Sequence, residues 1–314
     1  MAKRIRSNER QKMKLIDKEI MTTGDTDVFT VFPVGDVHIG SKNCAEGHFR
    51  RYVEHIKNTP NAYWIGGGDY CDCVTPSDVK RFDWRALPDW LFNGGADNIR
   101  DALSDIARQQ RQRFVGIVSP IRDKCIGMVE GNHEYSIMKH SNNAHHFVMC
   151  DELNVPNLTD SAFIRLRFVI PKKNTSSSAS VTMAIMHGSG GGRSAGAEPN
   201  HLDKLSRFID ADIILRGHSH TFDIEAPQIF LYAPRKGAMP DELMERTVHK
   251  ANWGCWVKSY AVGESTYDSR ACYPARPLQA MEIRIKPFHN IASKVSGRAA
   301  TKCVRKITIR ECDI

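Results

Sequence analysis

Five short segments of the chain carry side chains that bind metal ions in proteins, and each directly follows a run of residues predicted to form a strand. In chain order they are Asp36-Val37-His38, Gly68-Asp69-Tyr70-Cys71-Asp72, Gly131-Asn132-His133-Glu134, His187, and Gly217-His218-Ser219-His220. Because ligand sites in α/β proteins form where the carboxyl ends of strands meet, we expect these side chains to lie close together.

The mixture of carboxylate, imidazole and amide groups indicates more than one cation. A single histidine at a strand end is usually structural, but five such segments together are hard to explain in that way. Two cations about 3.5–4 Å apart need a bridging carboxylate, with imidazole and carboxylate ligands around them. The sequence therefore predicts a dinuclear metal centre.

Alternating strands and helices are predicted to position these segments. The expected strands are residues 28–34, 62–67, 126–130, 163–170, 181–186 and 211–216, and the expected helices are 45–58, 97–114 with Asp97 as N-cap, and 200–209. A Ser-rich loop at 171–180 joins two strands as a hairpin. Near the end of the chain, Ile283 with Ile285 and Ile307 with Ile309 alternate with polar, mostly basic residues, which predicts strands with one apolar and one basic face.

The chain is expected to form one domain with an N-terminal extension. Met13, Ile16 and Ile20 have helical spacing, so residues 1–21 are interpreted as a short helix or arm. We expect an arm and linker at 1–27 and a single domain at 28–314, with an inserted loop at 73–98 and basic strands within 278–314.

Composition places the chain among ordinary globular proteins, with 41% hydrophobic and 25% charged residues. No apolar run approaches the roughly 20 residues that span a bilayer, and the basic first ten residues lack the apolar core of a secretory signal. We therefore expect a cytoplasmic protein without a membrane partner. The nine cysteines include no Cys-x-x-Cys pair, which favours buried thiols over a zinc-thiolate site, although Cys71 and Cys73 near Asp69 could be sensitive to oxidation.

Positive charge gathers at the two ends of the chain. Residues 1–20 have a net charge of +4 and residues 283–310 one of +8; the total of +8 leaves −4 for the remainder. Basic ends around an acidic body suit attraction to a polyanion such as nucleic acid, and equally suit a solubilising surface.

The order Asp-x-His, Gly-Asp-x-x-Asp, Gly-Asn-His-Glu, His and Gly-His-x-His resembles the calcineurin-like metallophosphoesterase superfamily, over about residues 28–222. The resemblance implies an α/β fold, a four-layer αββα sandwich with two mixed sheets. It implies that one metal is bound by Asp36, His38 and His220, the other by Asn132, His187 and His218, and that Asp69 bridges both. Manganese is the metal expected first, with iron, zinc, nickel and magnesium as alternatives.

The same resemblance suggests roles for the neighbouring residues. His133 would contact the scissile phosphate and protonate the leaving oxygen, while Asp72 and Glu134 would orient the imidazoles. The residues themselves, apart from the resemblance, make Gly190, in the Gly-rich run 188–192, and Arg193 candidates to bind phosphate, with a plain flexible loop as the alternative. The segment Asn252-Trp253-Gly254-Cys255 is a further candidate to return to the site.

The sequence is compatible with three functions. Protein phosphatases of the superfamily continue the second motif with Arg-Gly, and the Cys73-Val74 found here disfavours that class. The basic ends favour a nuclease similar to the DNA-repair branch, which would hydrolyse phosphodiester bonds with a metal-activated hydroxide. The alternatives are a phosphodiesterase or phosphatase acting on nucleotides or cyclic nucleotides, and a non-catalytic nucleic-acid-binding protein. The oligomeric state is not indicated.

Overall fold

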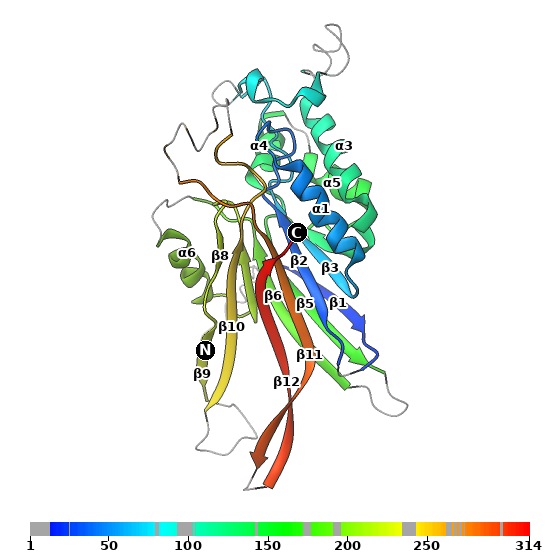
Figure 1. Ribbon diagram of the computed structural model, residues 1–314, viewed down its shortest axis with the longest axis vertical. Helices are drawn as coiled ribbons and strands as arrows, with labels where there is room; N and C mark the ends of the chain where they lie inside the picture. Colours follow the sequence, from blue (N-terminus) through cyan, green and yellow to red (C-terminus); the bar gives the residue numbers. More distant parts are fainter. Residues whose placement is uncertain are drawn as a thin grey trace, which may run out of the picture.

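The protein folds around two β-sheets that pack face to face, with helices on the outer faces (Figure 1). The computed structural model describes residues 13–24, 26–78, 82–92, 103, 105–141, 144–171, 177–190, 196–233, 243–261, 266, 269, 272, 274–295 and 298–314. None of the helices in these ranges is long and apolar enough to cross a bilayer.

The five-stranded sheet carries the first three ligand segments, which follow β2, β3 and β4. Its strands, in spatial order, are β12 (Arg298–Cys312), β11 (Ala280–Val295), β2 (Phe29–Gly35), β3 (Ala62–Gly68) and β4 (Cys125–Met128). β2, β3 and β4 are parallel, whereas β11 is antiparallel to both β2 and β12. Parallel pairing brings the carboxyl ends of β2 and β3, and hence Asp36 and Asp69, to the same edge of the sheet.

The seven-stranded sheet carries the last two ligand segments, which follow β6 and β7. Its strands are β1 (Lys14–Met21), β5 (Ser161–Ile170), β6 (Ser177–Met186), β7 (Ile213–Arg216), β10 (Met244–Trp253) and β8 (Phe222–Ile224) in this order, with β9 (Gln228–Tyr232) on β10. β6 and β7 are parallel, so His187 and His218 follow neighbouring strand ends. β5 and β6 form the predicted antiparallel hairpin, which makes this sheet mixed as well.

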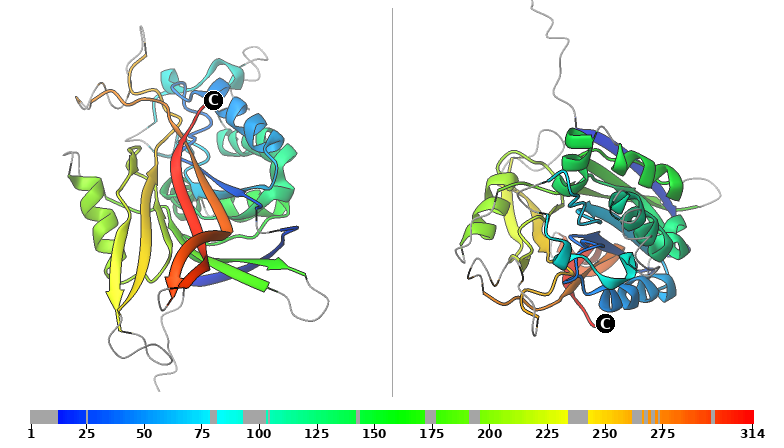
Figure 2. Two further views of the ribbon diagram at one scale, coloured as in Figure 1. Left: turned by 60° about the horizontal axis from the view of Figure 1, so that its bottom comes forward. Right: turned by 90° about the horizontal axis from the view of Figure 1, so that it is seen from above.

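Helices cover the outer face of each sheet, as Figure 2 shows from above. The helices are α1 (Glu46–Asn58), α3 (Ile106–Val118), α4 (Asn132–Ser141), α5 (His145–Leu153) and α6 (Ala197–Ser206). α1 buries Phe49, Tyr52, Val53 and Ile56 against the five-stranded sheet, as their spacing predicts. α6 lies beyond the seven-stranded sheet, where Leu205 packs near Ile214. The expected αββα arrangement with two mixed sheets is confirmed.

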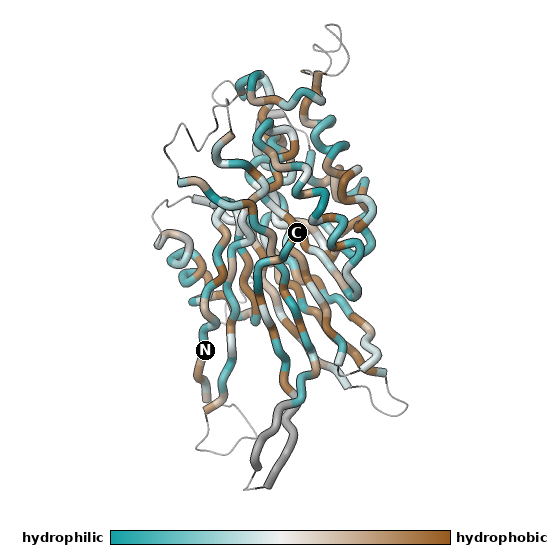
Figure 3. Tube along the Cα trace, in the orientation of Figure 1, coloured by the Kyte–Doolittle hydropathy of each residue, from teal (hydrophilic) through white to brown (hydrophobic). Residues whose placement is uncertain are grey.

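The space between the sheets is filled by apolar side chains from both. Val31 and Ile65 of one sheet pack in the same core as Ile164 and Met183 of the other, and all four are fully buried. Figure 3 shows that these central strands are rich in hydrophobic residues, whereas hydrophobic and hydrophilic residues alternate along the outer helices. This core fixes the two sheets, and so the two sets of ligand loops, relative to each other.

Two predicted elements need correction. Residues 14–21 form strand β1, which pairs in parallel with β5, and not a helix. Ile16 and Ile20 fit both a helical and an alternating pattern, and pairing to β5 selects the alternating one. The described part of the helix expected at 97–114 runs from Ile106 to Val118 with Asp105 as N-cap, and Asp97 lies outside the described residues.

The insertion at 73–98 contains two short 3₁₀ helices in its described part, at Trp84–Ala86 and Asp89–Leu91. At the end of the chain, Ile283 and Ile285 are fully buried and Arg284 is exposed, so the alternating pattern is confirmed there. Ile285 pairs with Phe29 at the beginning of β2. The remainder of β11 and most of β12 therefore extend away from the edge that carries Asp36 (Figure 1).

Candidate metal centre

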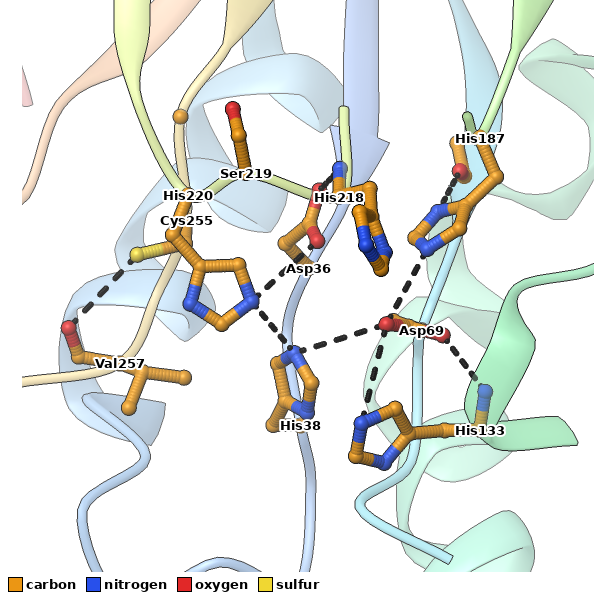
Figure 4. Close-up of polar contacts among 12 residues, drawn as sticks. Asp36, His38, Asp69, His133, His187, His218, Ser219, His220, Cys255 and Val257 are labelled. Carbon is orange, nitrogen blue, oxygen red and sulfur yellow. Dashed lines mark hydrogen bonds and ion pairs between the residues drawn. The ribbon is translucent and has the colours of Figure 1, made fainter. Parts of the chain in front are cut away.

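Backbone hydrogen bonds join the loops that follow β2 and β3. The amide of Asp36 donates to the carbonyl of Gly68 at 2.9 Å, and the amides of Val37 and His38 donate to the carbonyl of Asp69 at 2.9 and 3.0 Å. The side chains of both loops consequently point to one place, where they meet the histidines that follow β6 and β7 (Figure 4).

Asp36, His38 and His220 form the first half-site. The Nε2 atoms of His38 and His220 lie 3.0 Å apart, and the Nε2 atom of His220 is 3.4 Å from Oδ1 of Asp36. Oδ2 of Asp69 is 3.9 Å from Nε2 of His38. Four donor atoms thus face a common point.

Asn132, His187 and His218 form the second half-site. Oδ1 of Asn132 lies 3.0 Å from Nε2 of His187 and 2.7 Å from Nδ1 of His218. Oδ2 of Asp69, the atom that also faces the first half-site, is 3.1 Å from Nε2 of His187. All seven predicted ligands therefore come together, and Asp69 lies between the two groups as expected of a bridging carboxylate.

The ligand atoms of the cluster are arranged to bind divalent cations rather than to form hydrogen bonds with one another. Oδ1 of Asp36 is buried and has no hydrogen-bond donor, although buried carboxylate oxygens are normally paired. The two imidazole nitrogens of His38 and His220 face each other, where at most one proton can serve both. A cation between these atoms would satisfy the orphaned oxygen and both nitrogens at once, as Asp, Asn and His ligands do for Mn, Fe, Zn and similar ions.

Surrounding groups orient the ligands. The indole N–H of Trp253 donates to Oδ2 of Asp36 at 2.7 Å, which leaves Oδ1 facing the half-site. Nδ1 of His187 donates to the carbonyl of Gly67 at 2.9 Å, so its Nε2 is the free ligand atom. Oδ1 of Asp72 is 3.5 Å from Nδ1 of His38 and has the orienting position predicted for it.

His133 lies beside the cluster without being needed as a ligand. Its backbone amide donates to Oδ1 of Asp69 at 2.9 Å, and its Nε2 is 4.0 Å from Oδ2 of the same carboxylate. Its Nδ1 bonds to the backbone carbonyl of Asp72, which can only accept, so Nδ1 carries a proton. Nε2 is thereby left to face whatever binds at the centre.

The prediction that Glu134 orients an imidazole is wrong. Its Oε2 accepts from the amides of Asp69 and Gly131 at 3.0 and 3.1 Å, and its Oε1 accepts from the amide of Cys71 at 3.0 Å. A carboxylate at this helix start satisfies backbone donors that the turn leaves without partners. Glu134 therefore holds the loop that carries Asp69.

The backbone of the centre is strained. Among the described non-glycine residues with left-handed φ are five ligands, Asp36, His38, Asp69, His218 and His220. Each such conformation costs on the order of 1–3 kcal/mol and persists where the surroundings enforce it, commonly at functional sites. A Cβ at Gly131 would lie 2.1 Å from Oδ1 of Asp69, so only glycine fits at that turn.

Without cations, protons balance the charge of the cluster. Burial raises the pKa of Asp69, but the nearby His133 and His187 rings outweigh it and hold that pKa well below its usual range. Burial lowers the pKa of His187, but Asp69 and Asp36 outweigh it and raise that pKa to about 10. The pKa of His38 rises to about 9 against the effect of burial, because Asp72 and Asp69 face it. Burial lowers the pKa of His218 to about 4.

The Gly-rich loop after His187 is tied down by a residue that sequence analysis missed. Arg216, at the end of β7, donates from Nη2 to the carbonyls of Ser189 and Gly190 at 3.0 and 3.2 Å. Gly190 is thus fixed through its carbonyl, and a phosphate-binding role for its amide stays a prediction. Arg193 lies outside the described residues.

The 252–255 segment does return to the site, through Trp253 and through Asn252, whose side-chain amide donates to Oγ of Ser219 at 2.8 Å. Arg276 was not predicted: its guanidinium bonds to the carbonyl of Ser219, between His218 and His220. No motif marks Arg276, which lies far from the other segments in sequence, so only the fold could reveal it.

No family model matches this chain, and no curated protein matches it either. Among solved structures, vacuolar protein sorting 29 of Cryptosporidium parvum is 13% identical with a TM-score of 0.38, covering 90% of this chain and 99% of its own. A metallophosphoesterase of Sphaerobacter thermophilus is 11% identical with a TM-score of 0.31, covering 91% and 89%. A Streptococcus pneumoniae protein described as a predicted phosphoesterase is 13% identical with a TM-score of 0.30, covering 90% and 99%. Likeness this distant says nothing about activity.

Proposed function

We propose that this protein is a metal-dependent phosphoesterase with a dinuclear centre. The observation that carries the proposal is the convergence of seven donor side chains from five loops into two half-sites that share Oδ2 of Asp69. Asp36, His38 and His220 would hold one cation, and Asn132, His187 and His218 the other. Manganese is the first metal to try, because carboxylate and carbonyl oxygens, such as those of Asp36, Asp69 and Asn132, suit it.

Bound cations would lower the pKa of a water and neutralise charge on the phosphoryl oxygens. The protein's own contribution is to position the substrate and the proton that the leaving group needs. In the neutral His133 ring the proton sits on Nδ1 and Nε2 accepts. Burial lowers the pKa of His133, whereas an approaching phosphate anion would raise it and place a second proton on Nε2. His133 would then donate that proton to the leaving oxygen.

Substitution of His133 tests this role. His133→Ala should lower kcat by about 10²–10⁴-fold, the usual contribution of a positioned acid, while both cations stay bound. His48→Ala, an exposed histidine on α1, is the matched control and should leave kcat unchanged. Full activity in His133→Ala with intact metal content would remove His133 from the mechanism.

The substrate is the finer question, and the nuclease hypothesis depended on the basic ends of the chain. The hairpin of β11 and β12 extends away from the edge that carries Asp36. Several of its arginines are already paired with acids, Arg284 with Glu282 at 2.9 Å and Arg305 with Asp212 at 3.2 Å. Of the other basic segment, residues 1–20, residues 1–12 lie outside the described residues.

The placement of the hairpin favours a second candidate, hydrolysis of a small phosphoester such as a nucleotide or cyclic nucleotide. Among the described residues, two arginines bring positive charge beside the centre: Arg276 bonds to the carbonyl of Ser219, and Arg216 to the carbonyls of Ser189 and Gly190. Rates on nitrophenyl phosphate mono- and diesters, cyclic nucleotides, DNA and RNA would separate the candidates. A preference for DNA or RNA that falls steeply with salt would restore the nuclease hypothesis.

A further inference from the structure

A second cluster of ligand-type side chains lies behind the loop that carries Asp69. The Sγ atoms of Cys71 and Cys73 and a ring nitrogen of His145 all lie within 4.8 Å of one another. The three side chains are buried, with 0%, 4% and 0% of their surface exposed. Two come from the loop after β3, and His145 is the first residue of α5.

His145 is the observation that needs explaining. Neither of its ring nitrogens has a hydrogen-bond partner, although the ring is fully buried. A buried polar group without a partner costs about 1–3 kcal/mol, and such groups are rare in folded proteins. Burial, with Arg111 nearby, lowers the pKa of His145 to about 3, so the ring is neutral and has a lone pair available.

We propose that Cys71, Cys73 and His145 form a third metal site, selective for a thiophilic cation such as Zn²⁺. Thiolate and imidazole are the typical ligands of zinc, whereas the dinuclear centre presents oxygen and imidazole. On binding, each thiol releases its proton to solvent, and the two thiolates and one imidazole nitrogen bond to the cation. Two thiolates neutralise a divalent ion, which makes its burial tolerable.

The cation would anchor the loop of the dinuclear centre from behind. Cys71 and Cys73 flank Asp72, and the amide of Cys73 donates to Oε1 of Gln110 at 2.8 Å. The amide of Cys71 donates to Glu134, the carboxylate that also holds Asp69. A zinc ion here would therefore fix the loop without taking part in any reaction, and the site does not depend on the proposed hydrolysis.

Cobalt is a spectroscopic probe for this site, because only thiolate ligation gives a near-ultraviolet charge-transfer band. We would titrate Co²⁺ into the reduced, metal-stripped full chain. At saturation the band should have the intensity of one thiolate-bound Co²⁺ per chain, within three added equivalents because the dinuclear centre also takes Co²⁺. It should disappear in Cys71→Ser/Cys73→Ser. It should persist in Cys150→Ser, a matched buried thiol 3.6 Å from Nε2 of His146. It should also persist in His218→Ala, which damages only the dinuclear centre.

No band in the wild-type protein, or a band that survives in the double serine variant, would overturn the proposal. So would a Cys71–Cys73 disulfide in the protein purified without reductant, seen as the peptide that contains both cysteines with a mass two hydrogens lower. Should the serine variant fail to fold, alkylation of the wild-type protein decides. Added Zn²⁺ must slow modification of Cys71 and Cys73 but not of Cys150, and equal rates with and without Zn²⁺ count against the site.

Discussion

The two halves of the proposed dinuclear centre have the same number of imidazoles but different charge. The first has Asp36 as its own carboxylate, and Asp72 stands behind His38. The second has the neutral amide of Asn132, and a backbone carbonyl, that of Gly67, stands behind His187. Only Asp69 is common to both.

This difference implies unequal affinities. A cation in the first half-site would face two carboxylates, and one in the second half-site would face a single shared carboxylate. Since attraction between opposite charges dominates binding of hard cations, we expect the first half-site to fill first and the second to exchange more readily. The two cations then need not be the same element.

Removing the shared charge should have the largest effect. Asp69→Asn should lower affinity for both cations by more than about 10²-fold, beyond the cost of losing an outer-shell group. Each cation stabilises the wild-type protein by about 2.7 kcal/mol when its free concentration exceeds its Kd a hundredfold, and the variant should lose most of this gain in thermal unfolding. Asp123→Asn, whose side chain is 96% exposed, is the control. Two tightly held cations in Asp69→Asn would refute the shared carboxylate.

Two substitutions, one that removes a carboxylate from the first half-site and one that adds a carboxylate to the second, should change the difference in cation affinity between them. Asp36→Asn should release the first cation and leave the second, so metal content after dialysis falls from two to one. Asn132→Asp adds a carboxylate to the second half-site and should tighten it, because the donor position is kept while charge is gained. Binding isotherms with Mn²⁺ would show the order of filling. Equal affinities in the wild-type protein would contradict the comparison.

A smaller effect on cation affinity is expected from substitution of Asp72, which faces Nδ1 of His38. Asp72→Asn should weaken the first half-site alone by about 10–100-fold, the usual cost of losing an outer-shell partner. Competition with a chelator measures it. Loss of affinity in both half-sites would instead mean that Asp72 supports the whole loop.

The smallest expected effect is that of pH on cation affinity. The affinity of each half-site should change about tenfold per pH unit. His38 and His187, with pKa values of about 9 and 10, are protonated at neutral pH in the ion-free protein. A cation must displace one proton in each half-site, so affinity should rise as pH increases toward 9 and fall on acidification. Calorimetry in buffers of different ionisation enthalpy should count about two protons released at neutral pH. No release would mean that these rings are neutral beforehand.

The ligands could be predicted from sequence because they lie just after strands. The hydrophobic pattern predicts where each strand ends, and the residue types that follow indicate metal binding. The supports of the ligands could not be predicted. Trp253 reaches Asp36 from a strand far along the chain, and Glu134 binds backbone amides, which no side-chain pattern records. Cys71 and His145 are brought together only by the packing of α5, and the sequence favoured plain buried thiols. Strand β1 was predicted as a helix because Ile16 and Ile20, four residues apart, fit the spacing of a helix as well as the alternation of a strand.

The ladder between β2 and β3 continues past the last residues of both strands, through the amides of Asp36, Val37, His38 and Ile39 and on to Asp72. The two acidic loops therefore form one continuous ribbon, and the separation of their carboxylates is set by backbone register. Substitutions at Asp36 and Asp69 should consequently combine non-additively. Lengthening either loop by one residue would change the distance between the cations, whereas the inserted loop at 73–98 is not part of this ribbon and its length does not set that distance.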